Sequence, residues 1–400
     1  MSWNKVPIKT ICKGIYDGPH ATPPESSSGA VFLGIPNFIN GQLDLSNIRY
    51  ISEQDLPKWT KRVTPQPNDI VFSYEATLNL YAIIPKGFWG CLGRRMALIR
   101  VDERKADYKF LYYYFYSTAW RSVIQEHTVT GATVDRIPLV SFPDFLVELP
   151  DLPTQHRIAS ILSAYDDLIE NNRRQIKLLE EAAQRLYREW FVELRFPGHE
   201  GVKVIDGVPE GWMKGTVDNI VKLLSGYPFK SSEYVSSGKY RLITIKNVKD
   251  GEFSPDNVDY IDQLPDKVPS HCILTEGDIL LSLTGNIGRV CIVNGYNYLL
   301  NQRVAKLQTL HSAYAYCMFR SKEMLNKMTA LSNGVAQQNL SPIRAEKIRI
   351  LIPSSNLLFQ FKSIVEPIIS QIILLNNQIT FACEARHRLL PELMDGEIEV

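Results

Sequence analysis

The sequence contains two copies of one pattern, and this duplication constrains the fold more than any other feature. Residues of the first half recur in the same order in the second half: Trp3 and Lys5 as Trp212 and Lys214, Asp69-Ile70 as Asp278-Ile279, and Pro150 as Pro353. The offset between the copies varies only between 210 and 203 residues, as short insertions and deletions in loops would cause. The sequence therefore predicts two related halves.

Each copy begins with a mixed region, in which short β-rich runs alternate with Gly, Pro and Ser turns. Residues 69–72 and 278–281 are predicted to be equivalent buried strands, and residues 108–123 and 313–328 equivalent helices. A long helix follows each mixed region. We therefore predict an α+β fold, with globular domains at 1–150 and 196–353 and long helices at 151–195 and 354–394.

The two long helices carry apolar residues at alternating spacings of three and four, which is typical of a coiled-coil seam. The predicted pairing positions are Ile158, Ile161, Tyr165, Leu168, Ile176, Leu179 and Leu186 in the first helix, and Ile364, Ile368, Ile372, Leu375, Ile379 and Leu389 in the second. Pro367 predicts a kink in the second helix or a start near that residue.

A long amphipathic helix must bury its apolar stripe. We predict that the two helices pack on each other as an antiparallel coiled coil, which would relate the copies by a pseudo-two-fold axis and separate the globular domains. The alternative is that each helix packs on its own domain.

The composition excludes some classes of protein. A net charge of +1, from 44 Lys and Arg against 43 Asp and Glu residues, excludes a polycation or an acidic-tail protein but permits a local basic cleft. The six cysteines have neither C-x-x-C nor zinc-finger spacing, which indicates reduced and mostly buried thiols. Because we find no signal peptide and no apolar run of about 18 residues, we predict a cytoplasmic protein.

The sequence lacks the common catalytic motifs. It has no P-loop, no G-x-G-x-x-G after a strand, no Asn-Pro-Pro-aromatic run, no G-x-S-x-G and no H-E-x-x-H. Asp144 with Glu148 is similar to a nuclease carboxylate pair, but no lysine follows at the right spacing and the segment predicts a strand. We therefore expect no catalytic residue, metal site or cofactor in this chain.

Polar loops fall at matching points of the two copies but carry different side chains. Arg can contact guanine through two hydrogen bonds and Asn or Gln can contact adenine, whereas Lys, Ser and Thr more often contact phosphate. The candidate DNA-binding residues are Tyr16, His20, Thr22, Arg94, Arg95, Thr133, Lys230, Ser231, Thr284, Asn286, Arg289, Gln302, Arg303, Gln337, Gln338 and Asn339. The alternative for any one loop is an ordinary surface loop.

These motifs together resemble the specificity subunits of Type I restriction-modification systems. The matching segments are 16–23, 149–155 (Leu-Pro-Asp-Leu-Pro-Thr-Gln), 208–212 (Val-Pro-Glu-Gly-Trp), 276–280 (Glu-Gly-Asp-Ile-Leu), 283–288 (Leu-Thr-Gly-Asn-Ile-Gly) and 334–339. The resemblance covers essentially the whole chain. Two features depart from it: the loop at 76–79 of the first copy lacks the glycines of 285 and 288, and the second long helix contains Pro367.

The resemblance implies that each globular domain is a target recognition domain and that the paired helices act as a ruler between two DNA half-sites. Two methyltransferase subunits and restriction subunits would be the partners. S-adenosylmethionine, ATP and Mg²⁺ would then be bound by those partners, and the assembled complex would methylate adenine N6 or cut DNA. The alternatives are a two-headed protein-interaction scaffold that does not bind DNA, and a stand-alone DNA enzyme.

Overall fold

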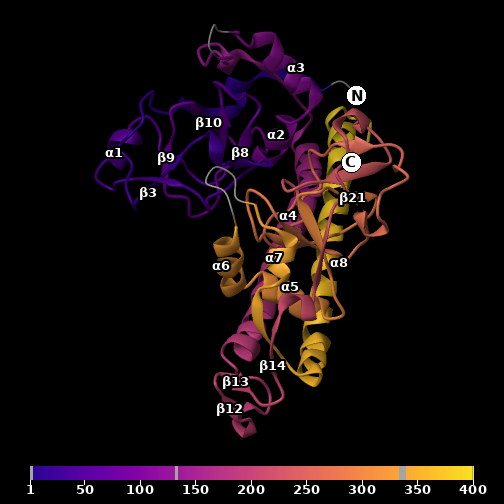
Figure 1. The fold of residues 1–400 in the computed structure, drawn as a ribbon. Helices are drawn as coiled ribbons and strands as arrows, with labels where there is room; N and C mark the ends of the chain where they lie inside the picture. The colour runs from indigo at the N-terminus through magenta and orange to yellow at the C-terminus, as the bar shows by residue number, and fades with distance from the viewer. Residues whose placement is uncertain (1–2, 131–133, 333–338, 399) are drawn as a thin grey trace. The chain divides into compact units, whose positions relative to one another are not determined.

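The computed structural model describes residues 3–130, 134–332, 339–398 and 400 (Figure 1). These residues form two compact units. The first unit combines the chain up to Leu168 with the segment from Ala382 onward, and the second runs from Ile169 to Phe381. Each long helix therefore supplies residues to both units.

The first unit is built on a four-stranded antiparallel sheet. Its strand order is β2 (Cys12–Asp17), β10 (Met96–Val101), β7 (Ile70–Ser73) and β8 (Tyr81–Ile83). A smaller three-stranded sheet has the order β6 (Arg49–Ile51), β3 (Ala30–Leu33) and β9 (Gly90–Leu92). Two further sheets have two strands each: β1 (Asn4–Pro7) pairs with β11 (Leu146–Leu149), and β4 (Phe38–Ile39) pairs with β5 (Gln42–Leu43). The short helices are α1 (Leu56–Trp59), α2 (Tyr108–Tyr114) and α3 (Thr118–His127).

The second unit repeats the strand order of the main sheet. Its main sheet has the order β15 (Lys222–Ser225), β22 (Val304–Gln308), β19 (Ile279–Ser282) and β20 (Val290–Ile292). A second four-stranded sheet has the order β17 (Tyr260–Ile261), β16 (Tyr240–Ile243), β21 (Tyr298–Leu300) and β18 (Ile273–Leu274). Two further sheets have two strands each: β14 (Met213–Thr216) pairs with β23 (Arg349–Ile352), and β12 (Val204–Ile205) pairs with β13 (Val208–Pro209). The helices are α5 (Ser312–Phe319), α6 (Lys322–Leu331) and α7 (Pro342–Glu346).

Individual contacts also recur in both units, which confirms the duplication. The Asn37 side-chain oxygen accepts from the backbone N–H of Gly34, and the Asn247 side-chain oxygen accepts from that of Thr244, both at 2.9 Å. Each asparagine then donates to a carbonyl seven residues further along the chain. The same side chain thus closes the same turn in each copy.

The helices predicted at 108–123 and 313–328 are each split in two. The Ser117 hydroxyl accepts from the backbone N–H of Trp120 at 3.2 Å, and the Ser321 hydroxyl accepts from that of Met324 at 3.2 Å. Serine is favoured at the N-cap because its side-chain oxygen accepts from a backbone N–H that would otherwise have no partner in the first turn of the helix. A new helix therefore begins after each serine, where apolar spacing alone predicted continuity.

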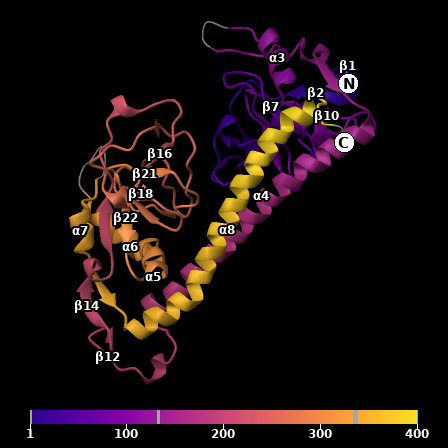
Figure 2. The same ribbon diagram turned by 90° about the vertical axis from the view of Figure 1, so that its right-hand side faces the viewer.

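The long helices are α4 (Leu152–Tyr187) and α8 (Ser355–Met394), which run side by side in Figure 2. In the second unit the Asn172 amide of α4 donates to Gln378 of α8 at 3.0 Å, and Tyr187 of α4 packs on Phe361 of α8 with ring centroids 6.4 Å apart. The residue number of the contact on α8 falls as the residue number on α4 rises, so the two helices are antiparallel in this unit. In the first unit an ion pair joins Asp166 of α4 to Arg386 of α8.

The buried seam differs from the predicted one by a single residue at several positions. Leu162, Ile169 and Tyr187 are buried, whereas Leu168 is 42% exposed and Ile364 is 46% exposed, contrary to the prediction. One residue along a helix is a rotation of about 100°, and adjacent apolar pairs such as Ile161-Leu162 and Leu168-Ile169 leave the phase ambiguous. Of the predicted positions, Ile158, Ile372 and Leu375 are fully buried.

Two further expectations about α8 need correction. The helix runs through Pro367 without a break, so it does not start there. It also contains an 18-residue window with a mean hydropathy of 1.4, which is long and apolar enough to cross a membrane by length and composition alone. Core helices of soluble proteins pass the same test, and α8 packs against α4 in the second unit. The cytoplasmic location stays a prediction.

Candidate nucleic-acid interface

In the first unit the candidate loops meet at one edge of the main sheet. The strand β2 ends and β10 begins at this edge, where Asp17 pairs with Ala97. The strand β7 ends and β8 begins there as well, because Ser73 pairs with Met96 and Phe72 pairs with Tyr81. Three loops distant in sequence are therefore brought together, and they follow Asp17, follow Ser73 and precede Met96.

Tyr74 connects these loops. Its hydroxyl donates to the backbone carbonyl of Arg94 at 3.1 Å and lies 3.4 Å from Nδ1 of His20. The Nε2 atom of His20 is 2.9 Å from the Asp17 carboxylate. Burial and the nearby carboxylates of Asp17 and Glu75 raise the pKa of Tyr74, so its phenol stays protonated and can donate. Tyr74 was not among the predicted residues, although it lies two residues after the buried strand predicted at 69–72.

The other candidates of the first unit surround this centre. Arg94 and Thr22 are exposed, and Arg95 forms an ion pair with Glu75 at 3.2 Å. Tyr16 is half-buried in β2, and the Arg100 guanidinium lies 5.9 Å from the centre of its ring. Tyr16 therefore supports the edge from within the sheet, whereas His20, Arg94 and Arg95 occupy the loops.

In the second unit the equivalent edge forms a hollow of about 620 Å³. It brings four of the predicted residues together, and its lining is Ser225, Leu283, Thr284, Gln302, Arg303, Asn339, Leu340, Ser341 and Pro342. The Thr284 hydroxyl donates to the Asn339 side-chain oxygen at 3.0 Å, which fixes two loops to each other. Guanidinium, amide and hydroxyl groups on one concave surface can read base edges and bind phosphate.

Both edges use the same backbone frame. The Tyr74 N–H donates to the Arg95 carbonyl at 3.2 Å, and the Leu283 N–H donates to the Arg303 carbonyl at 3.1 Å. The Ile137 N–H donates to the Tyr74 carbonyl at 2.7 Å, and the Leu340 N–H donates to the Leu283 carbonyl at 2.8 Å. A common scaffold therefore presents different side chains in the two units.

Packing explains why one position of the glycine-rich loop in the second unit is a glycine. Gly288 has a φ of +82°, and a Cβ atom there would meet a methyl group of Leu325 at 2.5 Å. The glycine thus lets the loop pack on α6. Asn286 is exposed on the same loop, and Arg289 is half-buried at its end.

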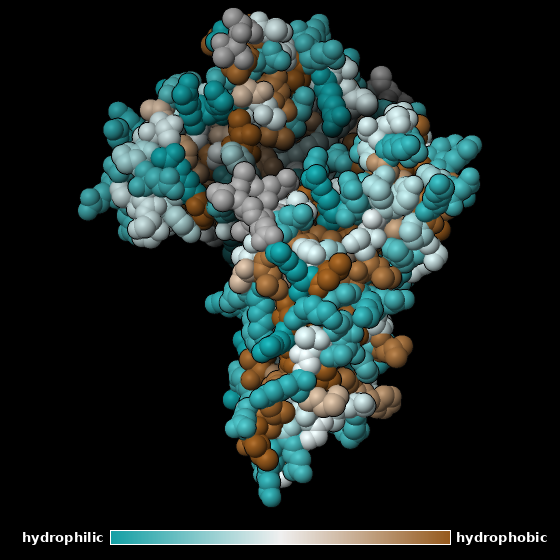
Figure 3. Space-filling model, viewed as in Figure 1, coloured by the Kyte–Doolittle hydropathy of each residue, from teal (hydrophilic) through white to brown (hydrophobic). Residues whose placement is uncertain are grey.

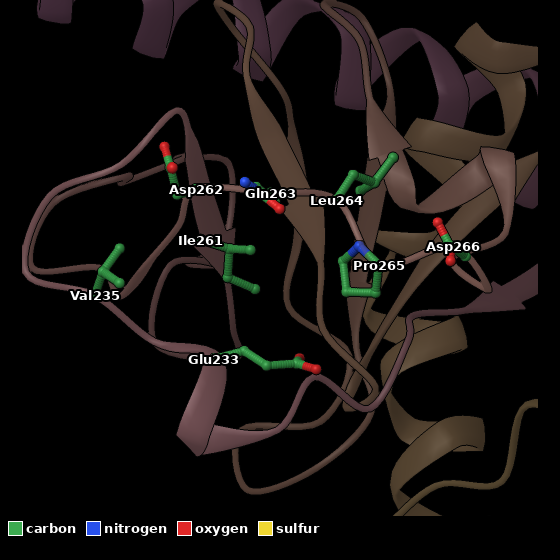
Figure 4. A pocket seen from close by; sticks show the side chains of 8 residues that line it. All are labelled: Glu233, Val235, Ile261, Asp262, Gln263, Leu264, Pro265 and Asp266. Carbon is green, nitrogen blue, oxygen red and sulfur yellow. The ribbon is translucent and has the colours of Figure 1, made fainter.

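Lys230 and Ser231 lie on the connection from β15 to β16, beside a second hollow. Glu233, Asp262 and Asp266 line this hollow together with Val235, Ile261, Gln263, Leu264 and Pro265 (Figure 4). Three carboxylates would repel phosphate, so this hollow does not suit DNA. Thr133, Gln337 and Gln338 lie outside the residues that the structure describes.

The matched edges define a class of protein in which one scaffold, repeated in tandem, presents two different sets of polar side chains. The family model described as "Type I restriction modification DNA specificity domain" matches residues 3–181 and 209–380. The chain therefore belongs to the Type I restriction-modification DNA specificity family, as its motifs predict.

Known relatives agree with this assignment. The chain is 26% identical to the Type I restriction enzyme MjaIX specificity subunit of Methanocaldococcus jannaschii, across 89% of this chain and 85% of that protein. It is 22% identical to the HindI specificity subunit of Haemophilus influenzae, across 67% and 72%. The crystal structure of a Type I restriction-modification S subunit from M. genitalium has the same fold, with a TM-score of 0.58, 16% identity and coverage of 98% and 96%. The function of the chain is DNA target recognition, and subunits of this kind are not catalytic.

Proposed function

We propose that the chain recognises a bipartite DNA target, with one short half-site read by each unit and an unspecified gap between them. The first half-site is assigned to His20, Arg94 and Arg95, and the second to Thr284, Gln302, Arg303 and Asn339. The observation that carries this assignment is the shared backbone frame with unlike side chains. If the two units bound one identical ligand, the side chains beside Arg95 and Arg303 would be expected to match. They differ although the backbone frame that carries them is the same.

We further propose that α4 and α8 pair along their lengths as an antiparallel ruler with pseudo-two-fold symmetry, and that two methyltransferase subunits and restriction subunits dock on this scaffold. A two-fold arrangement offers two equivalent docking surfaces to two copies of one partner. Large apolar side chains are exposed on these helices, which supports docking by partners: Leu178 (65%), Phe359 (69%), Leu374 (50%) and Phe381 (64%). Figure 3 shows brown apolar patches between hydrophilic residues in the part of the second unit where α5, β14 and α8 lie.

The partners would bind S-adenosylmethionine, ATP and Mg²⁺, and the assembled complex would methylate adenine N6 or cut DNA. Among the residues that the structure describes, no group of three His, Cys, Asp or Glu side chains could hold a metal ion. This chain would supply the choice of sequence and act in the cytoplasm with its DNA.

The test is a map of N6-methyladenine in cells that express the chain with its methyltransferase subunits. Arg303→Ala and Gln302→Ala should relax the second half-site and leave the first unchanged, because a lost bidentate base contact costs about 1–3 kcal/mol. His20→Ala and Arg94→Ala should act on the first half-site only. Lys222→Ala, at the opposite end of β15, is the control and should leave the map unchanged.

Two results would contradict the proposal. One is a methylation map that none of these loop substitutions alters. The other is a purified chain whose gel shift with duplex DNA does not weaken as salt concentration rises, since phosphate contacts release counterions.

A further inference from the structure

A segment outside the predicted loops adds a basic side chain to the loop edge in both units. In the first unit this segment connects α1 to β7, and Nη1 of Arg62 donates to the Asp17 carboxylate and, at 3.5 Å, to the Gly18 carbonyl. In the second unit the 209-residue offset places His271 at the same position. The Nε2 atom of His271 lies 2.9 Å from the Ser225 carbonyl, and Ser225 lines the hollow.

The residue after each basic side chain anchors the segment. Val63 packs against the apolar cluster beneath the edge of the first unit, and Cys272 is fully buried in the second. In the first unit Arg100 adds a further tie, because it donates to the Thr64 carbonyl at 3.0 Å and to the Asp69 carboxylate at 2.7 Å. The backbone that carries each basic residue is therefore fixed by the contacts of the residues that follow it.

Arg62 remains accessible despite its contacts. Its side chain is 51% exposed, and both contacts to the β2 loop use Nη1, although a guanidinium carries five N–H donors in a planar fork. His20 contacts the same Oδ2 atom of Asp17 as Arg62 does. Arg62 thus joins His20, Arg94 and Arg95 at the edge to which the first half-site is assigned.

We propose that Arg62 is a further DNA-contacting residue of the first unit, which donates to an acceptor on duplex DNA, and this inference rests on the proposed function. The acceptor is a phosphate oxygen or the O6 and N7 atoms of guanine, both of which suit an arginine fork. The segment that carries it is a fourth element of the recognition edge, together with the three loops already assigned.

The test must separate a DNA contact from mere neutralisation of Asp17. Arg62→Gln alone would leave the Asp17 carboxylate facing DNA, so the decisive variant is Arg62→Gln combined with Asp17→Asn. Binding is measured by fluorescence anisotropy with a duplex that carries the mapped target, using the complex of the full chain with its methyltransferase subunits. The double variant should bind about tenfold more weakly than Asp17→Asn alone.

The two acceptors give different signatures. A phosphate contact lowers affinity equally for all sequences and reduces the slope of log K against log salt by about one, whereas a guanine contact relaxes the preference at one base pair of the first half-site. Arg104→Gln is the matched control, because Arg104 also pairs with a carboxylate, Asp102 at 2.9 Å, but lies beyond the opposite end of β10. It should leave binding unchanged.

The proposal is overturned if the double variant and Asp17→Asn bind with the same affinity, salt slope and sequence preference while Arg303→Gln weakens the second half-site. If Arg303→Gln, His20→Ala and the double variant all leave binding unchanged, the proposed function fails as well. Intact recognition of the second half-site shows that the double variant is folded.

Discussion

Glu180 of α4 is a charged residue that is only 8% exposed, and its partners explain how the second unit holds it. The Tyr316 hydroxyl donates to its carboxylate at 2.5 Å, and the Arg320 guanidinium forms an ion pair with it. Arg320 also donates to the Asp250 carboxylate at 3.1 Å. Burial lowers the pKa of Arg320 to about 10, which still leaves it charged at neutral pH. The network links α4 to α5 and to the turn at 250–251.

Arg320→Met should destabilise the second unit strongly. It would leave the Glu180 carboxylate buried without its cation, and loss of one partner from a buried pair costs about 3–5 kcal/mol. The combined variant Glu180→Leu and Arg320→Met should lose much less, because apolar side chains of similar volume can replace a buried ion pair at little cost. Urea unfolding of the unmodified protein, the single variant and the combined variant measures these losses of stability. Equal losses in the single and combined variants would show that packing, not charge, governs the site.

The cysteines offer a second prediction at this scale. Burial raises the pKa of Cys91 and of Cys317 to about 12, and it also raises the pKa of Cys291. The thiolate is the reactive form, so these thiols should resist alkylation by iodoacetamide at pH 8 in the folded protein and react fully in guanidinium. Mass spectrometry of alkylated peptides measures the difference. Rapid labelling of Cys317 in the native protein would contradict the described packing around α5.

At the scale of elements, the phase of the α4 seam is testable. Ile169 is 3% exposed and the adjacent Leu168 is 42% exposed. Ile169→Ala should cost about 2–5 kcal/mol, because it removes a buried side chain and leaves a cavity, whereas Leu168→Ala should cost less than about 1 kcal/mol. Thermal or urea unfolding compares the two, and each variant is the other's control. A larger loss for Leu168→Ala would restore the seam predicted from the sequence.

The same seam shows what the sequence could and could not predict. The duplication, the two long helices and the α+β class followed from the order of matching residues, the spacing of apolar residues and the positions of Gly, Pro and Ser turns, all of which can be read along the chain. The phase of the seam did not follow, because Leu168 and Ile169 are both apolar and only their burial in the folded chain distinguishes them. The breaks at Ser117 and Ser321 were not predicted, although serine is a favoured N-cap residue at which a new helix can begin.

The candidate site likewise contains residues that the sequence predicted and residues that it did not. Thr284, Gln302, Arg303 and Asn339 were predicted as separate loops, and they line one hollow because β19 ends and β22 begins at one sheet edge. Tyr74 closely follows a predicted strand, but the sequence does not show that either Tyr74 or Arg62 reaches the His20 loop. That information resides in the strand register, which brings residues 17, 73 and 96 together.

For the whole molecule, the consequence of the proposed ruler is a gap length that depends on helix length. The helices α4 and α8 contain 36 and 40 residues, and each supplies residues to both units. Insertion of four residues after Leu168 and four after Phe381 would lengthen both helices by about 6 Å at 1.5 Å per residue. Because base pairs are spaced about 3.4 Å apart, the gap between the half-sites should grow by about one or two base pairs. Both half-sites themselves should stay the same, since no recognition loop is changed.

Mapping of N6-methyladenine in cells with the lengthened chain measures the gap directly. The matched control is the same four-residue insertion after Gly207, a turn residue with a φ of +73° and no neighbour within 4 Å of a Cβ placed there. This control should keep the original gap, because it lengthens a turn between β12 and β13 and not the helices. If the lengthened chain still methylates both half-sites at the original spacing, the separation of the half-sites is not set by α4 and α8, and another contact between chain and partner must fix it.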